Sequence, residues 1–226
     1  MSAPSDGRRP PRVLLLAYSY TGQTRALLDA AGDVFAERGW EVESAPIVPE
    51  DPRIARRFGT FPMRRVWPDM LSVLPAQARR ATCAVTVPES VVGGDYDLVC
   101  LGSPTWWSAA SMPMRSFLKS DDARKLLAGN NFAVFIACRG RWRGNLAEIT
   151  KLGRWQGGRY AGEYHATYPG NEVTSMLSLT SYLGSGEYRE KYLGVTLPPT
   201  NVSAAQLDEA RGFAESLADS LVGRDG

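Results

Sequence analysis

Short apolar runs alternate with longer segments of helical periodicity along most of this chain. Val13–Ala17, Tyr96–Gly102 and Phe132–Cys138 are almost wholly apolar, which is the pattern of strands buried on both faces of a parallel sheet. Trp40–Ile47 and Gly162–Thr167 predict two further strands. Strands of this kind need helices on both sides to cover them.

The longer segments carry apolar residues at helical spacing and therefore predict helices. They are a helix that follows Thr24 and ends near Arg38, a helix at Pro113–Lys119 with a further turn through Leu127, a helix at Asn145–Gln156, and a final helix from Ser203 to Leu221. Gly39 lies where a C-terminal cap belongs, and Ser203 is a suitable N-cap. The alternation of strand and helix favours an α/β domain with a parallel sheet.

Two segments do not fit this alternation. Residues 49–88 are rich in proline and arginine, and residues 169–200 are rich in turn-forming sequences. At 226 residues, the chain is long enough for one well-buried domain and short for two. We therefore expect a single domain at 12–222 with insertions at about 49–88 and 169–200. Residues 1–11 offer nothing to bury and are expected to form a disordered tail.

Composition narrows the class of protein. A formal net charge of +2 gives no electrostatic argument for nucleic acid as a partner. No run approaches 18 apolar residues and no secretory signal is apparent, so we expect no transmembrane segment. Cys83, Cys100 and Cys138 lack metal or CxxC spacing, which indicates reduced thiols in a cytoplasmic protein. The single histidine, His165, is interpreted as structural, and no metal site is expected.

A hydroxyl-rich loop joins the first predicted strand to the first helix. It consists of Ser19, Tyr20, Thr21, Gly22, Gln23 and Thr24. Such a loop presents backbone N–H groups at a helix N-terminus, where the helix dipole favours a phosphate. It lacks the Gly-Lys-Ser/Thr ending of a Walker loop and the GxGxxG of a dinucleotide fold. The loop therefore predicts a phosphate site, with an ordinary capped helix start as the alternative.

A second loop follows the third predicted strand. It consists of Gly102, Ser103, Pro104, Thr105, Trp106 and Trp107. A strand that stops in a rigid proline turn and then exposes two tryptophans indicates a flat, aromatic ligand. The alternative is that both tryptophans lie in the core or in an oligomer interface.

Together these two loops resemble the motifs of the flavodoxin superfamily, whose members bind FMN. YSYTGQT is followed about eighty residues later by YDLVCLGSPTWW and MPMRSFL, and the resemblance spans about residues 12–168 and the last helix. It implies a flavodoxin-like doubly wound fold of five parallel strands in the order 2-1-3-4-5. The cofactor would lie beyond the carboxyl ends of the strands, at the switch point.

The resemblance also implies roles for three loops. The FMN phosphate would lie on Ser19–Thr24, and the ribityl chain and isoalloxazine along Ser103–Trp107. A third binding loop would follow the fourth strand and would contribute Cys138, Arg139, Gly140, Arg141, Trp142 and Asn145. Flavodoxins commonly carry a tyrosine in this loop that stacks on the outer flavin face, and Trp142 is the nearest counterpart here.

The charge of the third loop departs from the family pattern. Short-chain flavodoxins are strongly acidic, whereas this loop holds Arg139, Arg141 and Arg143. A cation near the N1–C2=O edge of the flavin would stabilise the anionic, two-electron-reduced ring. Opposite charges 4 Å apart attract by about 4 kcal/mol at an effective dielectric of about 20. The loop therefore favours a hydride acceptor over a one-electron carrier, unless its arginines are solvated surface charges.

The first insertion adds further arginines with aromatic residues and methionines between them. It is expected to cover the flavin edge, bind the phosphates of NAD(P)H or receive a partner, or else to form a homodimer contact or a solvated lid. Its run RRFGTFPMRRVWPDMLSVLPAQ also resembles long flavodoxin-like proteins identified as dialkylresorcinol condensing enzymes. That resemblance implies an auxiliary role in a biosynthetic pathway.

Three functions follow from these features. The first is an FMN oxidoreductase that reduces a quinone or aromatic substrate with NAD(P)H. The second is a flavodoxin that transfers single electrons to a larger redox enzyme. The third is a flavin-free accessory protein of a biosynthetic pathway. The basic third loop favours the first over the second, and no individual catalytic residue is predicted.

Overall fold

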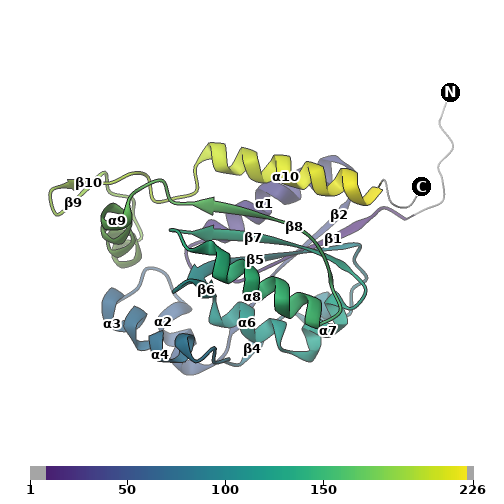
Figure 1. Cartoon of the computed structure of the whole chain (residues 1–226), viewed down its shortest axis with the longest axis horizontal. Coiled ribbons are helices and arrows are strands. Elements are labelled where there is room, and N and C mark those ends of the chain that lie inside the picture. Colours follow the sequence, from purple (N-terminus) through teal and green to yellow (C-terminus); the bar gives the residue numbers. More distant parts are fainter. Residues whose placement is uncertain (1–8, 223–226) are drawn as a thin grey trace.

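Five parallel strands form the centre of the computed structural model, which describes residues 9–222 (Figure 1). They are β1 (Arg12–Ala17), β2 (Glu41–Pro46), β5 (Leu98–Trp106), β7 (Asn131–Cys138) and β8 (Arg159–Thr167). Their order across the sheet is β2-β1-β5-β7-β8, and each neighbouring pair is parallel. This order confirms the predicted flavodoxin-like doubly wound fold.

Side chains of the central strands alternate between two hydrophobic cores. In β1, Leu14 and Leu16 pack into one core, whereas Val13 and Leu15 pack into the other. All four are buried, which explains why the sequence shows an unbroken apolar run instead of an alternating one.

Helices cover both faces of this sheet (Figure 1). One face carries α1 (Gln23–Glu37) and α10 (Ala204–Val222), which contact each other. The other face carries α5 (Glu89–Val92), α6 (Met112–Leu118), α7 (Asp121–Leu127) and α8 (Trp142–Trp155). The described helices include none that is long and apolar enough to cross a membrane.

The third strand of the sheet is longer than expected. We predicted that it would end in a proline turn after Gly102, but β5 continues through Pro104 to Trp106. The neighbouring strand β1 ends opposite Gly102, so Pro104 has no partner in β1. Proline is tolerated at such an edge because its missing N–H removes no bond from the sheet. The turn lies at Trp107 and Ser108, and a short antiparallel strand, β6 (Ala109–Ala110), follows it.

Two helix boundaries also differ from expectation. The turn expected after Lys119 is a separate helix, α7, because Ser120 caps its N-terminus by accepting a hydrogen bond from the Ala123 amide (3.3 Å). Helix α8 begins at Trp142 and not at Asn145, so part of the predicted third loop is helical.

Both predicted insertions contain regular structure. The first forms β3 (Val48–Pro49), α2 (Pro52–Phe58), α3 (Val66–Ser72), α4 (Leu74–Ala78) and β4 (Val85–Thr86). The second forms α9 (Glu172–Ser185), β9 (Lys191–Tyr192) and β10 (Val195–Thr196). Helix α9 was not predicted. Asn171 caps its N-terminus and Gly186, at φ 77°, caps its C-terminus.

The two insertions meet beside the carboxyl ends of the strands (Figure 1). The amide of Met63 donates a hydrogen bond to the carbonyl of Leu183 (2.7 Å), and the rings of Phe61 and Tyr182 lie 5.1 Å apart. A third hydrophobic core, which includes Phe58, Met63 and Leu183, lies between them.

The predicted disordered tail falls only partly within the described residues. Residues 1–8 lie outside them. Within them, Arg9 forms ion pairs with Asp95 and Asp97, each at 3.0 Å.

Candidate functional site

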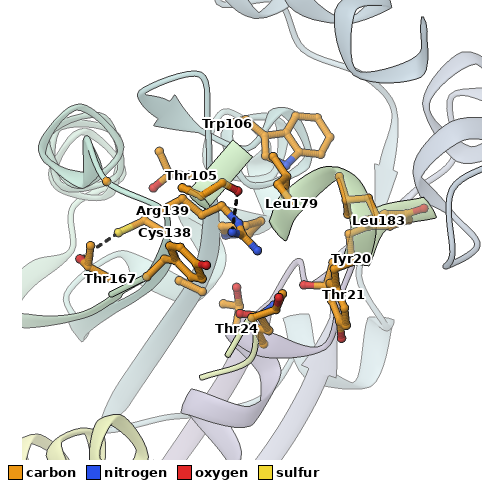
Figure 2. Close-up of a pocket in the computed structure, with 18 of the residues that line it drawn as sticks. Tyr20, Thr21, Thr24, Thr105, Trp106, Cys138, Arg139, Thr167, Leu179 and Leu183 are labelled. Carbon is orange, nitrogen blue, oxygen red and sulfur yellow. Dashed lines mark hydrogen bonds between the residues drawn. The ribbon is translucent and has the colours of Figure 1, made fainter. Parts of the chain in front are cut away.

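A cavity of about 470 Å³ lies at the carboxyl ends of the strands (Figure 2). Its walls come from the loops after β1, β7 and β8, the β5–β6 hairpin, the first insertion and α9. The volume lies within the range of about 300–1,000 Å³ that is typical of small-molecule sites. The position matches the switch-point site of open α/β sheets, where ligands bind beyond the carboxyl ends of the strands.

Most residues of the predicted binding loops line this cavity. They are Tyr20, Thr21, Gln23, Thr24, Pro104, Thr105, Trp106, Trp107, Cys138, Arg139, Gly140 and Arg141. Ser19, Gly22, Ser103, Trp142 and Asn145 are not among the lining residues.

The loop after β1 has the geometry of an anion site. Gly22 has φ +79°, a conformation that favours glycine, and directly precedes α1. The hydroxyl of Ser19 accepts a hydrogen bond from the Arg25 amide (3.1 Å) and so fixes the loop instead of facing the cavity. Within residues 9–222, the amides of Gln23 and Thr24 have no hydrogen-bond partner. The two free amides therefore lie at the positive end of the helix dipole.

Tyr20 ties this loop to the first insertion. Its hydroxyl donates to the Thr60 carbonyl (2.9 Å), and its ring lies edge-on to Phe58 (5.8 Å) and Phe61 (5.6 Å). Burial, with a smaller contribution from Asp69, raises the pKa of Tyr20 to about 12, so its hydroxyl remains a donor at neutral pH.

The two tryptophans of the second loop lie in different environments. Trp106, at the end of β5, packs against Phe58 (4.7 Å between ring centroids) and edge-on to Tyr18 (5.6 Å). Trp107 has φ 49° in the hairpin turn and is 39% exposed. Both line the cavity, but the ring of Trp106 is already held by two aromatic neighbours.

A buried polar network fixes the hairpin that carries these tryptophans. The fully buried Arg115 donates to the carboxylate of Glu148 (2.6 Å) and to the carbonyl of Ala110 (3.0 Å). Gln77 of the first insertion donates to the carbonyls of Trp106 (3.0 Å) and Ala110 (2.7 Å). Sequence reasoning missed these residues, although an arginine inside the apolar helix MPMRSFL was a usable signal.

Asn145 supports the same hairpin from α8. Its side-chain amide donates to the hydroxyl of Thr105 (3.0 Å), a cavity residue, and it is itself fully buried. Ser103 is buried as well, with its hydroxyl 3.1 Å from that of Ser111. Both predicted residues therefore lie behind the cavity wall.

The three arginines of the third loop separate in the structure. Arg139 projects into the cavity (Figure 2), where it donates to the Ser175 carbonyl (2.9 Å) and lies 4.5 Å above the ring of Tyr168. Arg141 has a side chain that is 76% exposed and lies 3.5 Å from Glu172. The guanidinium of Arg143 lies over the ring of Trp142 (4.9 Å), outside the cavity.

Arg139 is a cation without a carboxylate partner. No ion pair includes it among the described residues, and it is partly buried. Burial lowers the pKa of Arg139 to about 10, against the opposing effects of Tyr168 and Tyr182. The side chain is charged at neutral pH, and no described residue neutralises its charge with an ion pair.

Trp142 stacks on the only histidine of the chain. The ring of His165 lies 3.8 Å from that of Trp142 at an interplanar angle of 22°. Burial lowers the pKa of His165, and Arg143 lowers it further, while Glu163 and Glu209 raise it. This stack lies beside the cavity and not in its wall, and no group of three potential metal ligands occurs in residues 9–222.

Cys138 contributes a thiol to the cavity. Its sulfur lies 3.3 Å from the hydroxyl of Thr167. Figure 2 marks this contact with a dashed line. Burial raises the pKa of this thiol, although its contacts with Thr167 and Gly140 oppose the effect. The thiol is therefore protonated at neutral pH and is a poor nucleophile.

The residues of α9 were the largest omission from the predicted site. Ser175, Met176, Leu179, Tyr182 and Leu183 all line the cavity. The repeat of apolar residues at Val173, Met176, Leu179 and Leu183, between Asn171 and Gly186, was the signal that predicts this helix.

No protein-family model and no curated protein sequence matches this chain. Similar solved structures include a flavodoxin from the domain Archaea, with 12% identity over 93% of this chain and 98% of that chain and a TM-score of 0.49. Flavodoxin 1 from Bacillus cereus is 15% identical over 92% of this chain and 98% of its own, with a TM-score of 0.47. The Trp repressor binding protein from Bacillus subtilis is 13% identical over 76% and 97%, with a TM-score of 0.41. The fold assignment rests on the strand order.

Proposed function

We propose that this protein binds FMN in the cavity and catalyses the two-electron reduction of a quinone or other aromatic substrate, with NAD(P)H as reductant. The observation that carries the proposal is that one cavity contains both a helix N-terminus with free amides and Arg139, an arginine that forms no ion pair with a described residue. The first suits a phosphate, and the second suits a ring that becomes anionic on reduction.

The cavity residues fit FMN at its phosphate end. The free amides of Gln23 and Thr24, and the hydroxyls of Thr21 and Thr24, would hold the phosphate. Thr24 is buried, and so its hydroxyl would bind a phosphate largely shielded from water.

The aromatic walls fit the flat end of the cofactor. Trp107, the more exposed tryptophan, and Trp106 are the candidates to contact the isoalloxazine. FMN supplies the redox chemistry when bound, and the protein supplies binding, orientation and electrostatics. The two insertions would exclude water from the ring, which strengthens every electrostatic contact inside.

The charges around the cavity support two-electron over one-electron chemistry. Among the lining residues that the structure describes, Glu172 is the only carboxylate, and it pairs with Arg141. Arg139 would therefore contribute a net positive field, which favours the anionic reduced ring. An electron-transferring flavodoxin with an acidic flavin site would have the opposite field.

Two measurements test this function. The first measurement is a fluorescence titration of FMN and of riboflavin with purified protein. FMN fluorescence should be quenched at a much lower protein concentration than riboflavin fluorescence, because riboflavin lacks the phosphate. FMN-loaded protein should then oxidise NADH or NADPH in the presence of a quinone such as menadione. A protein that binds neither flavin would support the flavin-free accessory role, and one that binds FMN without this activity would support the electron-carrier role.

A further inference from the structure

The guanidinium of Arg139 has N–H donors that its contacts within the protein do not use. Within the described part of the chain its guanidinium donates one hydrogen bond, to the Ser175 carbonyl (2.9 Å), and it lies 4.5 Å from the centre of the Tyr168 ring. A guanidinium has five N–H donors in a rigid fork, so most of its hydrogen-bonding capacity is available to a ligand. Glu172, at the start of α9, does not take up this capacity. Its side chain is 92% exposed and pairs with Arg141.

An apolar wall lies on the same side of the cavity. Helix α9, whose Ser175 carbonyl holds Arg139, also contributes Met176, Leu179 and Leu183. Phe58 and Met63 of the first insertion continue this wall. Holding an unpaired cation at the edge of an apolar surface costs desolvation free energy, unless an anion binds to it. The surface therefore suits a ligand that is apolar over most of its length and anionic at one end.

The phosphate of FMN is not the anion that this position suits. The phosphate loop follows β1 and Arg139 follows β7, and β5 lies between those strands. Neighbouring strands are about 4.8 Å apart, so the two strand ends are separated by about 10 Å. A phosphate held at Thr21–Thr24 leaves the guanidinium free for a second charged group.

We propose that Arg139 binds the carboxylate of an apolar organic acid whose hydrocarbon or aromatic part packs against α9 and the first insertion. A carboxylate matches the planar fork of one arginine in a bidentate pair. A dianionic phosphate beside a single cation and an apolar wall would remain partly uncompensated. The inference rests on the proposed function in one respect, since it names an acid as the substrate class of the FMN site.

The test compares two ligands of nearly equal shape, naphthalene-2-carboxylate and naphthalene-2-carboxamide. Their affinities are measured by isothermal titration calorimetry, with FMN-free and with FMN-saturated protein. The carboxylate should bind at least tenfold more tightly in both forms, because a hydrogen bond to a charged group contributes about 1.5–3 kcal/mol. This comparison uses the unmodified protein and does not depend on the folding of any variant.

Variants then assign the preference to one arginine. Arg139→Met keeps much of the side-chain length, removes the charge and should abolish the preference for the carboxylate. Arg139→Lys should retain part of it, because lysine keeps the charge and loses the fork. Arg143→Met is the matched control: it removes a nearby arginine whose guanidinium lies over Trp142, outside the cavity, and should leave the preference unchanged.

The outcomes separate this inference from the proposed function. Equal affinities for the acid and the amide, or a preference that survives in Arg139→Met, would overturn the carboxylate site. Competitive displacement of the acid by FMN would also overturn it, because the anion site would then belong to the flavin. A carboxylate preference in a protein that binds no FMN would reject the proposed function while upholding Arg139 as a carboxylate site.

Discussion

Three arginines that follow β7, two in the loop and one at the start of α8, illustrate how neighbouring residues of one type differ in chemistry. Arg139 lies in the cavity and has no acidic partner within residues 9–222, whereas Arg141 pairs with Glu172 at the surface and Arg143 lies over Trp142. Sequence alone gave the three equal weight, because RGRWRG does not reveal which side chain turns inward. Only Arg139 is positioned to act on a bound ring.

Of these three arginines, only Arg139 should therefore affect the reduction potential of bound FMN. Removing a cation near the ring disfavours the anionic reduced form, so Arg139→Met should lower the two-electron potential by about 30 mV or more, which corresponds to about 1.4 kcal/mol. Arg141→Met and Arg143→Met should leave it nearly unchanged. Anaerobic equilibration with a reference dye, without added acid, measures all three. Equal shifts in the three variants would mean that the field of the whole loop, and not one residue, sets the potential.

The phosphate loop gives a second prediction at this scale. Thr21→Ala and Thr24→Ala should each weaken FMN binding by about 1 kcal/mol, the usual contribution of one hydrogen bond. Riboflavin binding should not change. Thr24→Ser restores the hydroxyl without the methyl group and is the control for lost packing, since Thr24 is buried against Gly102. Fluorescence titration measures the affinities, and equal losses for both flavins would place the phosphate elsewhere.

At the scale of elements, the β5–β6 hairpin depends on groups from three distant segments. Arg115 of α6, Glu148 of α8 and Gln77 of α4 meet at the Ala110 backbone. Arg80 also pairs with Glu148. Because this network holds the Trp106 carbonyl as well, disturbing it should move the tryptophan wall of the cavity.

Glu148 should make stability depend on pH. Burial by itself would raise the pKa of Glu148, but Arg115, Arg80 and the Ala110 amide outweigh it and lower the pKa below the ordinary value of 4.5. The stabilisation is therefore complete above about pH 4.5 and is lost as the pH falls through the lower, folded-state pKa. Urea unfolding between pH 3 and 6 should show this loss, and Glu148→Gln should remove that part of the pH dependence. Glu172→Gln, at an exposed position, should not.

The elements that sequence predicted well are those whose environment is uniform along their length. Val13–Ala17 and Phe132–Ile136 are buried on both faces, and a continuous apolar run has few other interpretations. Helix α9 has one face toward the cavity and another that is partly exposed. The serines and threonines in its sequence obscured the spacing of its apolar residues. The helices of the first insertion span five to seven residues, too few for periodicity to appear. The predicted loops line the cavity where they follow strand ends, whereas α9, which also lines it, was not predicted.

At the scale of the molecule, the cavity joins parts of the chain that are far apart in sequence. Strand-end loops form its floor, and the two insertions contact each other through Met63 and Leu183. A ligand that fills the cavity would therefore contact both the central sheet and the insertions. We expect these parts to unfold together when the ligand is bound.

Thermal unfolding tests this coupling together with the cofactor. A ligand that binds only the folded protein stabilises it by about 2.7 kcal/mol at a free concentration of 100 times its Kd. For a chain of this size, each kcal/mol raises Tm by roughly 2–4 °C, so FMN should raise it by about 5–11 °C. Riboflavin at the same concentration should raise it less, because it lacks the phosphate. Differential scanning calorimetry should show one transition that moves as a whole. Two transitions, of which FMN shifts only one, would mean that the insertions unfold independently of the sheet and do not enclose the cofactor.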